Sequence, residues 1–343
     1  MQGKDPPQSR TAKVNGNDCI RKAFELKQVP VDSLEIMLAS ISKSTRKHYR
    51  CTLTRWLVFS QEKKINPYSP KAREVIAFLT KRFNEGSSYS TLNSDRCAIA
   101  LIANNNIGED KLVSRFIKGC FKLRPTRPRY PVTRDVEIVL SYIENMDDND
   151  DLSLKDLTHK TAILLALTSA QRGQFLSKIK IENMAIFKDK IIIIITDLLK
   201  TSRPGVQNPQ VCLRTFTDRP KLCVVNAIKK YLDRTKNIRG KETRLFISIV
   251  SPHVAVGTQT LARWIKTMMN RAGVDVEMFK AHSTRHAATS AAFTRGLSID
   301  KIKESADWSE KSQMFAKHYN RTIVNDKNNF AFTVLSKWKH KKL

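Results

Sequence analysis

The stretch of residues 122–134, which reads KLRPTRPRYPVTR, most constrains how this chain can fold. It holds three prolines, Pro125, Pro128 and Pro131, among several basic residues. Proline fixes the backbone angle φ and has no N–H to donate, so neither a continuous helix nor a central strand can run through this stretch. We therefore predict a basic linker at residues 122–133 between two domains, at 29–121 and 134–343.

The first domain is predicted to be helical. Tyr49, Leu53, Trp56 and Leu57 recur at helical spacing as one apolar stripe, and further stripes follow as far as Phe121. This pattern is typical of a small domain of four or five helices. Residues 1–28 are polar and rich in Gly, Pro and Asn, which predicts a disordered or loosely attached arm.

The second domain is predicted to be mainly α with a small antiparallel β-sheet. Thr133 is expected to cap its first helix, and a long buried helix is expected at 154–170. An isoleucine-rich run at 190–196 and a second run at 211–216 predict a β-hairpin. The remaining expected elements are helices at 136–146, 221–236, 258–272 and after 282, a short strand at 245–249, and an apolar stripe in the tail formed by Ala331, Val334, Leu335 and Trp338.

The charge of the chain indicates a polyanionic partner. The formal net charge is +29, from 61 Lys and Arg against 32 Asp and Glu, far more than solubility requires, so nucleic acid is the first candidate. The longest apolar run, at 191–195, is too short to cross a membrane. The six cysteines are scattered, without CxxC pairs, which favours free thiols in a reducing compartment and no zinc site.

Candidate reactive residues concentrate between residues 281 and 321. His282 and Arg285 are three positions apart in an expected helix, so both can reach one anion. Trp308 follows, and then Tyr319, which stands among basic residues. Cations around an anion with a phenol nearby favour phosphate chemistry in which the phenol attacks. His282 and His286 would also make half of a zinc site, but no third ligand stands at helical spacing.

Five motifs in their order and spacing resemble the tyrosine recombinase, or phage integrase, family. They are ALTSAQR, which ends at Arg172, a hairpin lysine at Lys200, HSTRH at 282–286, ADW at 306–308 and FAKHYNR at 315–321. Within the family, ALTSAQR, KAHSTRHAATSAA and FAKHYNR look most like the recombinases of eukaryotic mobile elements, namely DIRS-like and Ngaro-like retrotransposons and Cryptons. The sequence departs from the family at Phe175, near the usual place of an acidic residue, and at Trp308, where most members have His.

The resemblance implies a role for each matched residue, with no metal or other cofactor. Arg172 and Arg285 would clamp the scissile phosphate, whose geometry suits the guanidinium fork. Tyr319 would attack the phosphorus and form a 3′-phosphotyrosine, and Lys200 would protonate the leaving 5′-oxygen. His282 would move a proton or orient the phosphate, and Trp308 would donate a hydrogen bond to the phosphate or pack beside Tyr319.

The resemblance also implies the assembly. A SAM-like helical domain and the catalytic domain would form a C-shaped clamp on double-stranded DNA. The protein would be a monomer or dimer when free and a homo-tetramer in the synaptic complex, in the nucleus or the host compartment that holds DNA. The tail stripe would pack within its own chain or onto a neighbouring protomer. The expected DNA-contacting residues are basic: Arg46, Lys47, Arg50, Arg124, Arg127, Arg129 and Arg203.

Two alternatives to an active recombinase of a mobile element stay open at this point. The chain could be a DNA-binding protein that descends from such a recombinase and has lost catalysis. A type IB topoisomerase-like activity would use the same chemistry. Each basic residue taken alone is also consistent with an ordinary solvated surface.

Overall fold

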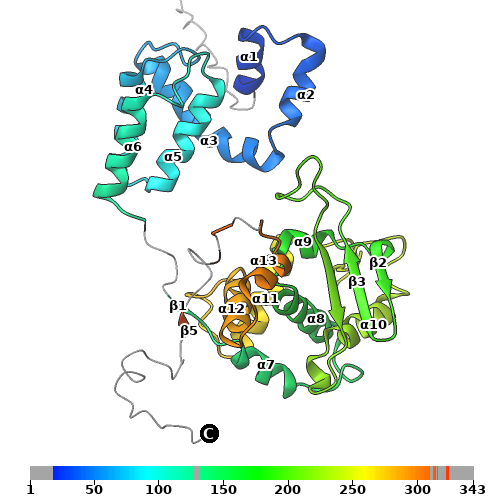
Figure 1. Cartoon of the computed structure of the whole chain (residues 1–343). Coiled ribbons are helices and arrows are strands. Elements are labelled where there is room, and N and C mark those ends of the chain that lie inside the picture. Colours follow the sequence, from blue (N-terminus) through cyan, green and yellow to red (C-terminus); the bar gives the residue numbers. More distant parts are fainter. Residues whose placement is uncertain (1–17, 127–131, 310–311, 314, 316–321, 324–343) are drawn as a thin grey trace, which may run out of the picture. The chain divides into compact units, whose positions relative to one another are not determined.

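The computed structural model describes residues 18–126, 132–309, 312–313, 315 and 322–323. The predictions for Tyr319, Arg127, Arg129, the tail stripe and residues 1–17 lie outside this part of the chain. The protein divides into two compact units between Arg127 and Pro128 (Figure 1). This division falls inside the proline-rich stretch 122–133 for which the sequence predicts a linker.

The first unit consists of helices around an aromatic core. Trp56, Phe59 and Phe78 lie with their ring centroids 5.3–6.0 Å apart, and Thr52 donates a buried hydrogen bond of 2.5 Å to Asp95. Each of these helices packs one side against the core and therefore needs an apolar stripe, which is why such stripes predicted most of them. Its helices are α1 (Asp18–Leu26), α2 (Leu34–Ala39), α3 (Lys43–Glu62), α4 (Ala72–Asn84), α5 (Tyr89–Ile102) and α6 (Lys111–Leu123).

The prediction of a loosely attached arm over residues 1–28 is wrong for its last third. Residues 18–26 form α1, whose Cys19, Ile20, Ala23 and Phe24 are buried in the core of the unit. These four positions recur at helical spacing, so one face of a short helix is apolar although the segment as a whole is polar. The average composition of residues 1–28 concealed this face.

The second unit is built around α8 (Leu154–Ser169), which is buried on nearly all sides. Figure 1 shows α8 between the β-sheet and the α12 side of the unit. The buried helix predicted at 154–170 is confirmed, because α8 ends at Ser169 and Ala170 turns the chain with φ of 50°. The helix α8 packs mainly against α9 (Gly173–Lys178), α10 (Val224–Thr235), α11 (Thr258–Arg271) and α12 (Ser283–Thr294). The unit also contains α7 (Glu137–Glu144), which packs against α11, and α13 (Ile299–Ser305), which packs against α12.

The sheet is antiparallel, with the order β2 (Met184–Ile186), β3 (Lys190–Ile194) and β4 (Gln210–Arg214). The predicted hairpin is confirmed as β3 and β4, in a register that pairs Ile191 with Leu213 and Ile193 with Val211 on the buried face. The three-residue strand β2 was not predicted. The strand expected at 245–249 is wrong, because Ile247 forms only an isolated bridge to Ala255.

A short parallel pair joins β1 (Val132–Thr133) to β5 (Thr322–Ile323), and both strands pack against α12. The prediction that Thr133 caps the first helix is therefore wrong. Thr133 lies in β1, and α7 begins only at Glu137, whose N–H donates to the Asp135 carboxylate at 2.9 Å. The Asp135 carboxylate, and not the Thr133 hydroxyl, accepts the hydrogen bond from the first turn of the helix.

The fold class predicted from the sequence, mainly helical with a small antiparallel sheet, is confirmed. None of the helices in the described ranges is both long and apolar enough to cross a bilayer.

Candidate active site

Arg172 stands where the buried helix α8 turns into α9. The left-handed Ala170 redirects the chain, and the buried Gln171 donates through Nε2 to the Ser305 carbonyl at 2.8 Å. These contacts fix the backbone on the N-terminal side of Arg172, which precedes the first residue of α9. Its side chain stays about one-third exposed and lies 3.7 Å from Asp307, measured from Nη1 to Oδ2. The guanidinium is therefore held but still open to a ligand.

Arg285 lies in the first turn of α12 and is almost completely buried, with 1% of its surface exposed. Its Nη2 donates to the Ala306 carbonyl, and its guanidinium lies 4.8 Å from the ring centroid of Trp308. The segment at 306–308 therefore fixes the orientation of Arg285 from one side. A buried guanidinium that is held in this way keeps its charge in place for an incoming anion.

A cavity of about 130 Å³ links Arg285 to the region around Arg172. Its lining includes Gln171, His282 and Arg285, and it therefore joins the end of α8 to the start of α12. These residues are more than a hundred positions apart in the sequence. The fold brings the ALTSAQR and HSTRH motifs to one site.

His282 immediately precedes α12 and is exposed at the protein surface. The surrounding protein lowers the pKa of its imidazole below the ordinary value, and the positive charges of Arg285 and Arg172 lower that pKa further. A lowered pKa keeps the ring neutral at pH 7, when it is able to accept a proton. His286 lies nearby, with ring centroids 5.6 Å apart, but no group of three or more metal-ligating side chains occurs in the described ranges.

Trp308 is buried and belongs to a small apolar cluster with Ala170, Ile302, Ala306 and Phe315. Its ring centroid lies 6.2 Å from that of Phe315. This packing holds the indole beside Arg285, and the role of Trp308 toward the phosphate or Tyr319 stays a prediction. Phe315 is four residues before Tyr319 and β5 begins three residues after it, so the chain is anchored to this unit on both sides of the proposed nucleophile.

Lys200 lies in the connection between β3 and β4, and its side chain is exposed. Its backbone N–H donates to the side-chain oxygen of Gln174 at 3.2 Å. The next residue, Thr201, donates through Oγ1 to Asp307 at 2.8 Å. Arg172, Lys200 and Asp307 consequently line one small hollow. The loop that carries Lys200 lies beside the segment that carries Arg172.

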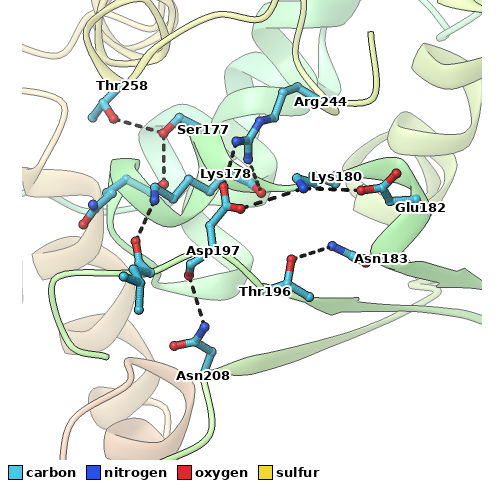
Figure 2. Close-up of polar contacts among 12 residues, drawn as sticks. Ser177, Lys178, Lys180, Glu182, Asn183, Thr196, Asp197, Asn208, Arg244 and Thr258 are labelled. Atoms are coloured by element: carbon cyan, nitrogen blue, oxygen red, sulfur yellow. Dashed lines mark hydrogen bonds and ion pairs between the residues drawn. The ribbon is translucent and has the colours of Figure 1, made fainter. Parts of the chain in front are cut away.

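The connection is also fixed at its root, as Figure 2 shows. The Asp197 carboxylate accepts from Arg244 at 2.7 Å, and this contact lowers the pKa of that carboxyl. Asn208 donates through Nδ2 to the Asp197 carbonyl at 3.1 Å, and Lys178 donates to the Leu198 carbonyl at 2.6 Å. These bonds close the base of the loop, so Lys200 projects from a defined position.

The departure at Phe175 has a structural explanation. Phe175 is buried in the core of the unit with 1% of its surface exposed, and a carboxylate there would be desolvated without a partner. The acidic group beside Arg172 is instead Asp307, which sequence reasoning missed. The sequence shows that Asp307 directly precedes Trp308 of the ADW motif, which places it near the expected site. Spacing along the chain does not reveal its contact with Thr201, which is 106 positions away.

The predicted DNA-contacting residues differ in their surroundings. Lys47 and Arg50 on α3 are exposed, as is Arg203 in the hairpin connection, whereas Arg46 is half-buried. Arg124 donates to the carbonyls of Phe83 and Ser87, at 3.1 and 3.0 Å, and its guanidinium stacks 4.1 Å from the ring of Phe83. Arg124 therefore ties the end of α6 to α4, and its contact with DNA stays a prediction.

A basic surface on α6 was not predicted from the sequence. Lys111, Arg115, Lys118 and Lys122 repeat at spacings of three or four residues and therefore share one helix face. They line a hollow of about 520 Å³ together with Glu109, Ser114 and Gly119. The helical spacing of these cations was visible in the sequence, but the exposure of this face was not.

Comparisons with known proteins find matches to both units. The profile of the phage integrase family matches residues 136–325, and that of the phage integrase N-terminal SAM-like domain matches residues 33–110. An integrase/recombinase XerD homologue of Selenomonas ruminantium is 21% identical over 263 residues, which are 74% of this chain and 75% of the relative.

Solved structures with similar folds include three DNA complexes. The XerH recombinase bound to its difH substrate has a TM-score of 0.59 at 14% identity, covering 90% of this chain and 86% of that one. The Tn1549 transposon integrase with transposon end DNA has a TM-score of 0.56 at 14% identity, covering 94% and 99%. A lambda integrase tetramer bound to a Holliday junction has a TM-score of 0.53 at 16% identity, covering 93% and 82%.

Proposed function

Because the chain belongs to the phage integrase family, the tyrosine recombinases, we propose that it is a site-specific recombinase or transposase of a mobile element. It cuts and rejoins DNA through a 3′-phosphotyrosine at Tyr319. One observation carries this proposal: the fold brings the segment of Arg172 to the same cavity as His282 and Arg285, which come more than a hundred positions later in the sequence, and both arginines lower the pKa of His282. A cluster of two guanidiniums and a neutral imidazole suits a phosphodiester.

The chemical step balances without a cofactor. The Tyr319 oxygen attacks the phosphorus and loses its proton to His282 or to water, while the bond between phosphorus and the 5′-oxygen breaks. Lys200 donates a proton to that 5′-oxygen, which leaves as a hydroxyl. The reverse step, with a 5′-hydroxyl from another strand as the nucleophile, rejoins DNA and releases Tyr319. The phosphotyrosine stores the bond energy, so no external energy source is required.

Charge around the site favours the transition state. Arg285 is buried and oriented before DNA binds, so it loses little freedom when the negative charge on phosphorus grows. Arg172 remains partly exposed and able to form a bidentate contact with the non-bridging oxygens. In this proposal the arginines fill the electrostatic role that a metal ion has in other phosphoryl-transfer enzymes.

We also propose an origin, a cellular location and an oligomeric state for the protein. The motifs ALTSAQR, KAHSTRHAATSAA and FAKHYNR favour a recombinase of a eukaryotic mobile element, of the DIRS-like, Ngaro-like or Crypton type, which acts in the nucleus. A homo-tetramer on two DNA sites is supported by the likeness to a lambda integrase tetramer bound to a Holliday junction. The protein is proposed to be a monomer or dimer when free.

Double-stranded DNA is the proposed partner of both units. The basic α6 face supports phosphate contacts by the first unit, together with Lys47 and Arg50 of α3. Arg203 supports a contact by the hairpin connection of the second unit. Phosphate contacts hold DNA without reading its sequence. The placement of the two units on the duplex stays a prediction.

A covalent-capture experiment tests the proposal. Nicked duplexes with a randomised core are incubated with the full chain, and protein–DNA complexes that survive denaturation are recovered and sequenced. We expect wild-type protein to enrich a defined site and Tyr319→Phe to give no covalent band while still binding DNA. Binding without a covalent band in the wild type would instead indicate a catalytically silent DNA-binding protein. Relaxation of supercoiled plasmids regardless of sequence would indicate a type IB topoisomerase.

A further inference from the structure

Asp307 is placed to connect two parts of the candidate active site. It lies after α13 and directly before Trp308, which contacts Arg285. Its Oδ2 accepts a hydrogen bond of 2.8 Å from Thr201 and lies 3.7 Å from Nη1 of Arg172. One carboxylate thus contacts both the loop that carries Lys200 and the first arginine of the site.

The backbone at Asp307 has a conformation that glycine adopts more readily than aspartate. Its φ of 53° lies in the left-handed region, which costs a non-glycine residue free energy. Glycine would make the same turn without this cost. Strained residues of this kind gather at functional sites, where the surrounding contacts hold them in place. Here the contacts are those of the carboxylate with Thr201 and Arg172.

The Lys200 loop needs such an attachment. The bonds of Asp197 and Asn208 fix its root, and Ser202 closes the loop on itself by accepting from the Leu199 N–H at 2.8 Å. The contacts that attach Lys200 and Thr201 to other parts of the unit are the backbone bond to Gln174 and the bond from Thr201 to Asp307. Asp307 is the acidic residue among those that line the hollow shared with Arg172. A proton donor on an exposed loop acts well only if its position is set before the reaction.

Resting on the proposed function, we propose that Asp307 is a positioning residue for the general acid Lys200. It takes the place of the acidic residue that the family usually has near Phe175. By holding Thr201 and Arg172 at once, it sets the distance between the ammonium that protonates the 5′-oxygen and the guanidinium that holds the phosphate. The long contact of 3.7 Å to Arg172 leaves the guanidinium able to bind that phosphate.

The test compares two leaving groups on the DNA site recovered by covalent capture. One substrate carries the natural 5′-oxygen at the scissile phosphate, and the other carries sulfur at that bridging position. A thiolate leaves without protonation, so a defect in proton donation disappears with sulfur, whereas a defect in phosphate binding or folding does not. Single-turnover rates of covalent-complex formation and DNA dissociation constants are measured for both substrates.

We expect Asp307→Asn to form the covalent complex about 10–100-fold more slowly on the oxygen substrate, as a misplaced catalytic group would, and at nearly the wild-type rate on sulfur. Asparagine tolerates positive φ, so this change keeps the turn. Asp307→Asn removes the charge that strengthens the bond from Thr201, whereas Thr201→Val removes that bond altogether. Thr201→Val is expected to give the same pattern, and the double variant is expected to be no slower than Thr201→Val. Lys200→Ala provides the reference for sulfur rescue.

The matched control is Glu304→Gln, which removes the same charge from an exposed position on α13 and is expected to leave both rates unchanged. Equal losses on oxygen and sulfur would overturn the proposed role, because proton donation would then not be the affected step. Faster reaction or tighter DNA binding by Asp307→Asn would also overturn it and would indicate that the carboxylate occupies the phosphate site. Absence of a covalent complex with wild-type protein on either substrate would overturn the proposed function itself.

Discussion

His282 shows how the second unit adjusts a single residue. Desolvation by the surrounding protein lowers the pKa of its imidazole, and the positive charges of Arg285 and Arg172 lower it further because they repel a protonated ring. The consequence is a ring that stays neutral to a lower pH than an ordinary histidine, whose pKa is about 6.5. A neutral ring beside two guanidiniums is suited to accept a proton without weakening the attraction for a phosphate.

This effect predicts a shift in titration when one arginine is removed. The His282 ring should titrate below pH 6.5 in the wild type, and its pKa should rise toward the ordinary value in Arg172→Gln, because one repelling charge is lost. NMR titration of the ring protons, assigned with His282→Asn, measures both values. Arg203→Gln, an exposed arginine on the hairpin connection, serves as the control and should leave the pKa unchanged. An unshifted His282 in Arg172→Gln would contradict the proposed proximity.

At this scale the sequence identified candidate reactive residues, but not the residues that hold them in place. Arg172, His282 and Arg285 stand in recognisable motifs, and the fold brings them together. Asp307 escaped because its partners are distant, with Thr201 separated from it by 106 positions. No spacing rule connects residues that meet only after several elements have packed. Tyr319 lies outside the described residues, and its role stays a prediction.

At the scale of elements, the helix α8 carries ionisable side chains into the core. His159 has 3% of its surface exposed and lies 5.7 Å from the ring of Trp264. Burial lowers the pKa of His159 to about 4, with Arg271 adding to the effect. The folded protein therefore keeps this ring neutral at a pH where the unfolded chain would protonate it.

The sign of the resulting pH dependence follows from proton counting. Between pH 6.5 and about 4 the unfolded state binds more protons at His159 than the folded state, so the free energy of unfolding falls as the pH falls. From pH 7 to pH 5 the wild type should lose on the order of 1–2 kcal/mol more than His159→Leu, which has no proton to bind. Urea unfolding followed by tryptophan fluorescence measures the difference, with the exposed His48→Gln as the control. Equal losses in the wild type and His159→Leu would contradict it.

Elements with a strong periodic pattern were predicted well, and the failures were short. The helix α8 and the β3–β4 hairpin follow from long apolar runs, because burial on several sides requires such runs. The strand β2 has three residues, too few for a periodic signal to stand out, and the apolar face of α1 was concealed by the polar composition of residues 1–28. The strand expected at 245–249 was a buried apolar run that tertiary packing left without a ladder.

At the scale of the whole molecule, part of the net charge of +29 lies on exposed basic surfaces. The α6 face gathers cations at helical spacing, whereas Arg124 shows that not every arginine near the linker is free for DNA. The net charge predicted a nucleic-acid partner, which agrees with membership of the phage integrase family. It did not identify the surface, because exposure and competing contacts are decided only by the fold.

Removing charge from the α6 face should weaken DNA binding in a salt-dependent way. For Arg115→Gln/Lys118→Gln, the slope of log binding constant against log salt concentration should fall by about two, since each phosphate contact contributes roughly 0.9. Fluorescence anisotropy with a nonspecific duplex at several salt concentrations measures this slope. Lys63→Gln/Lys64→Gln removes two exposed charges from the same unit as the control. Equal slopes for the two double variants would exclude the α6 face from the DNA contact.

In the proposed reaction, Tyr319 becomes joined to the 3′-phosphate of a cut DNA strand. Digestion of the covalent complex with trypsin and nuclease, followed by mass spectrometry, measures this linkage directly. We expect a peptide in which Tyr319 carries nucleotides through their 3′-phosphate, together with a free 5′-hydroxyl on the other DNA end. Attachment to another residue, or through a 5′-phosphate, would contradict it.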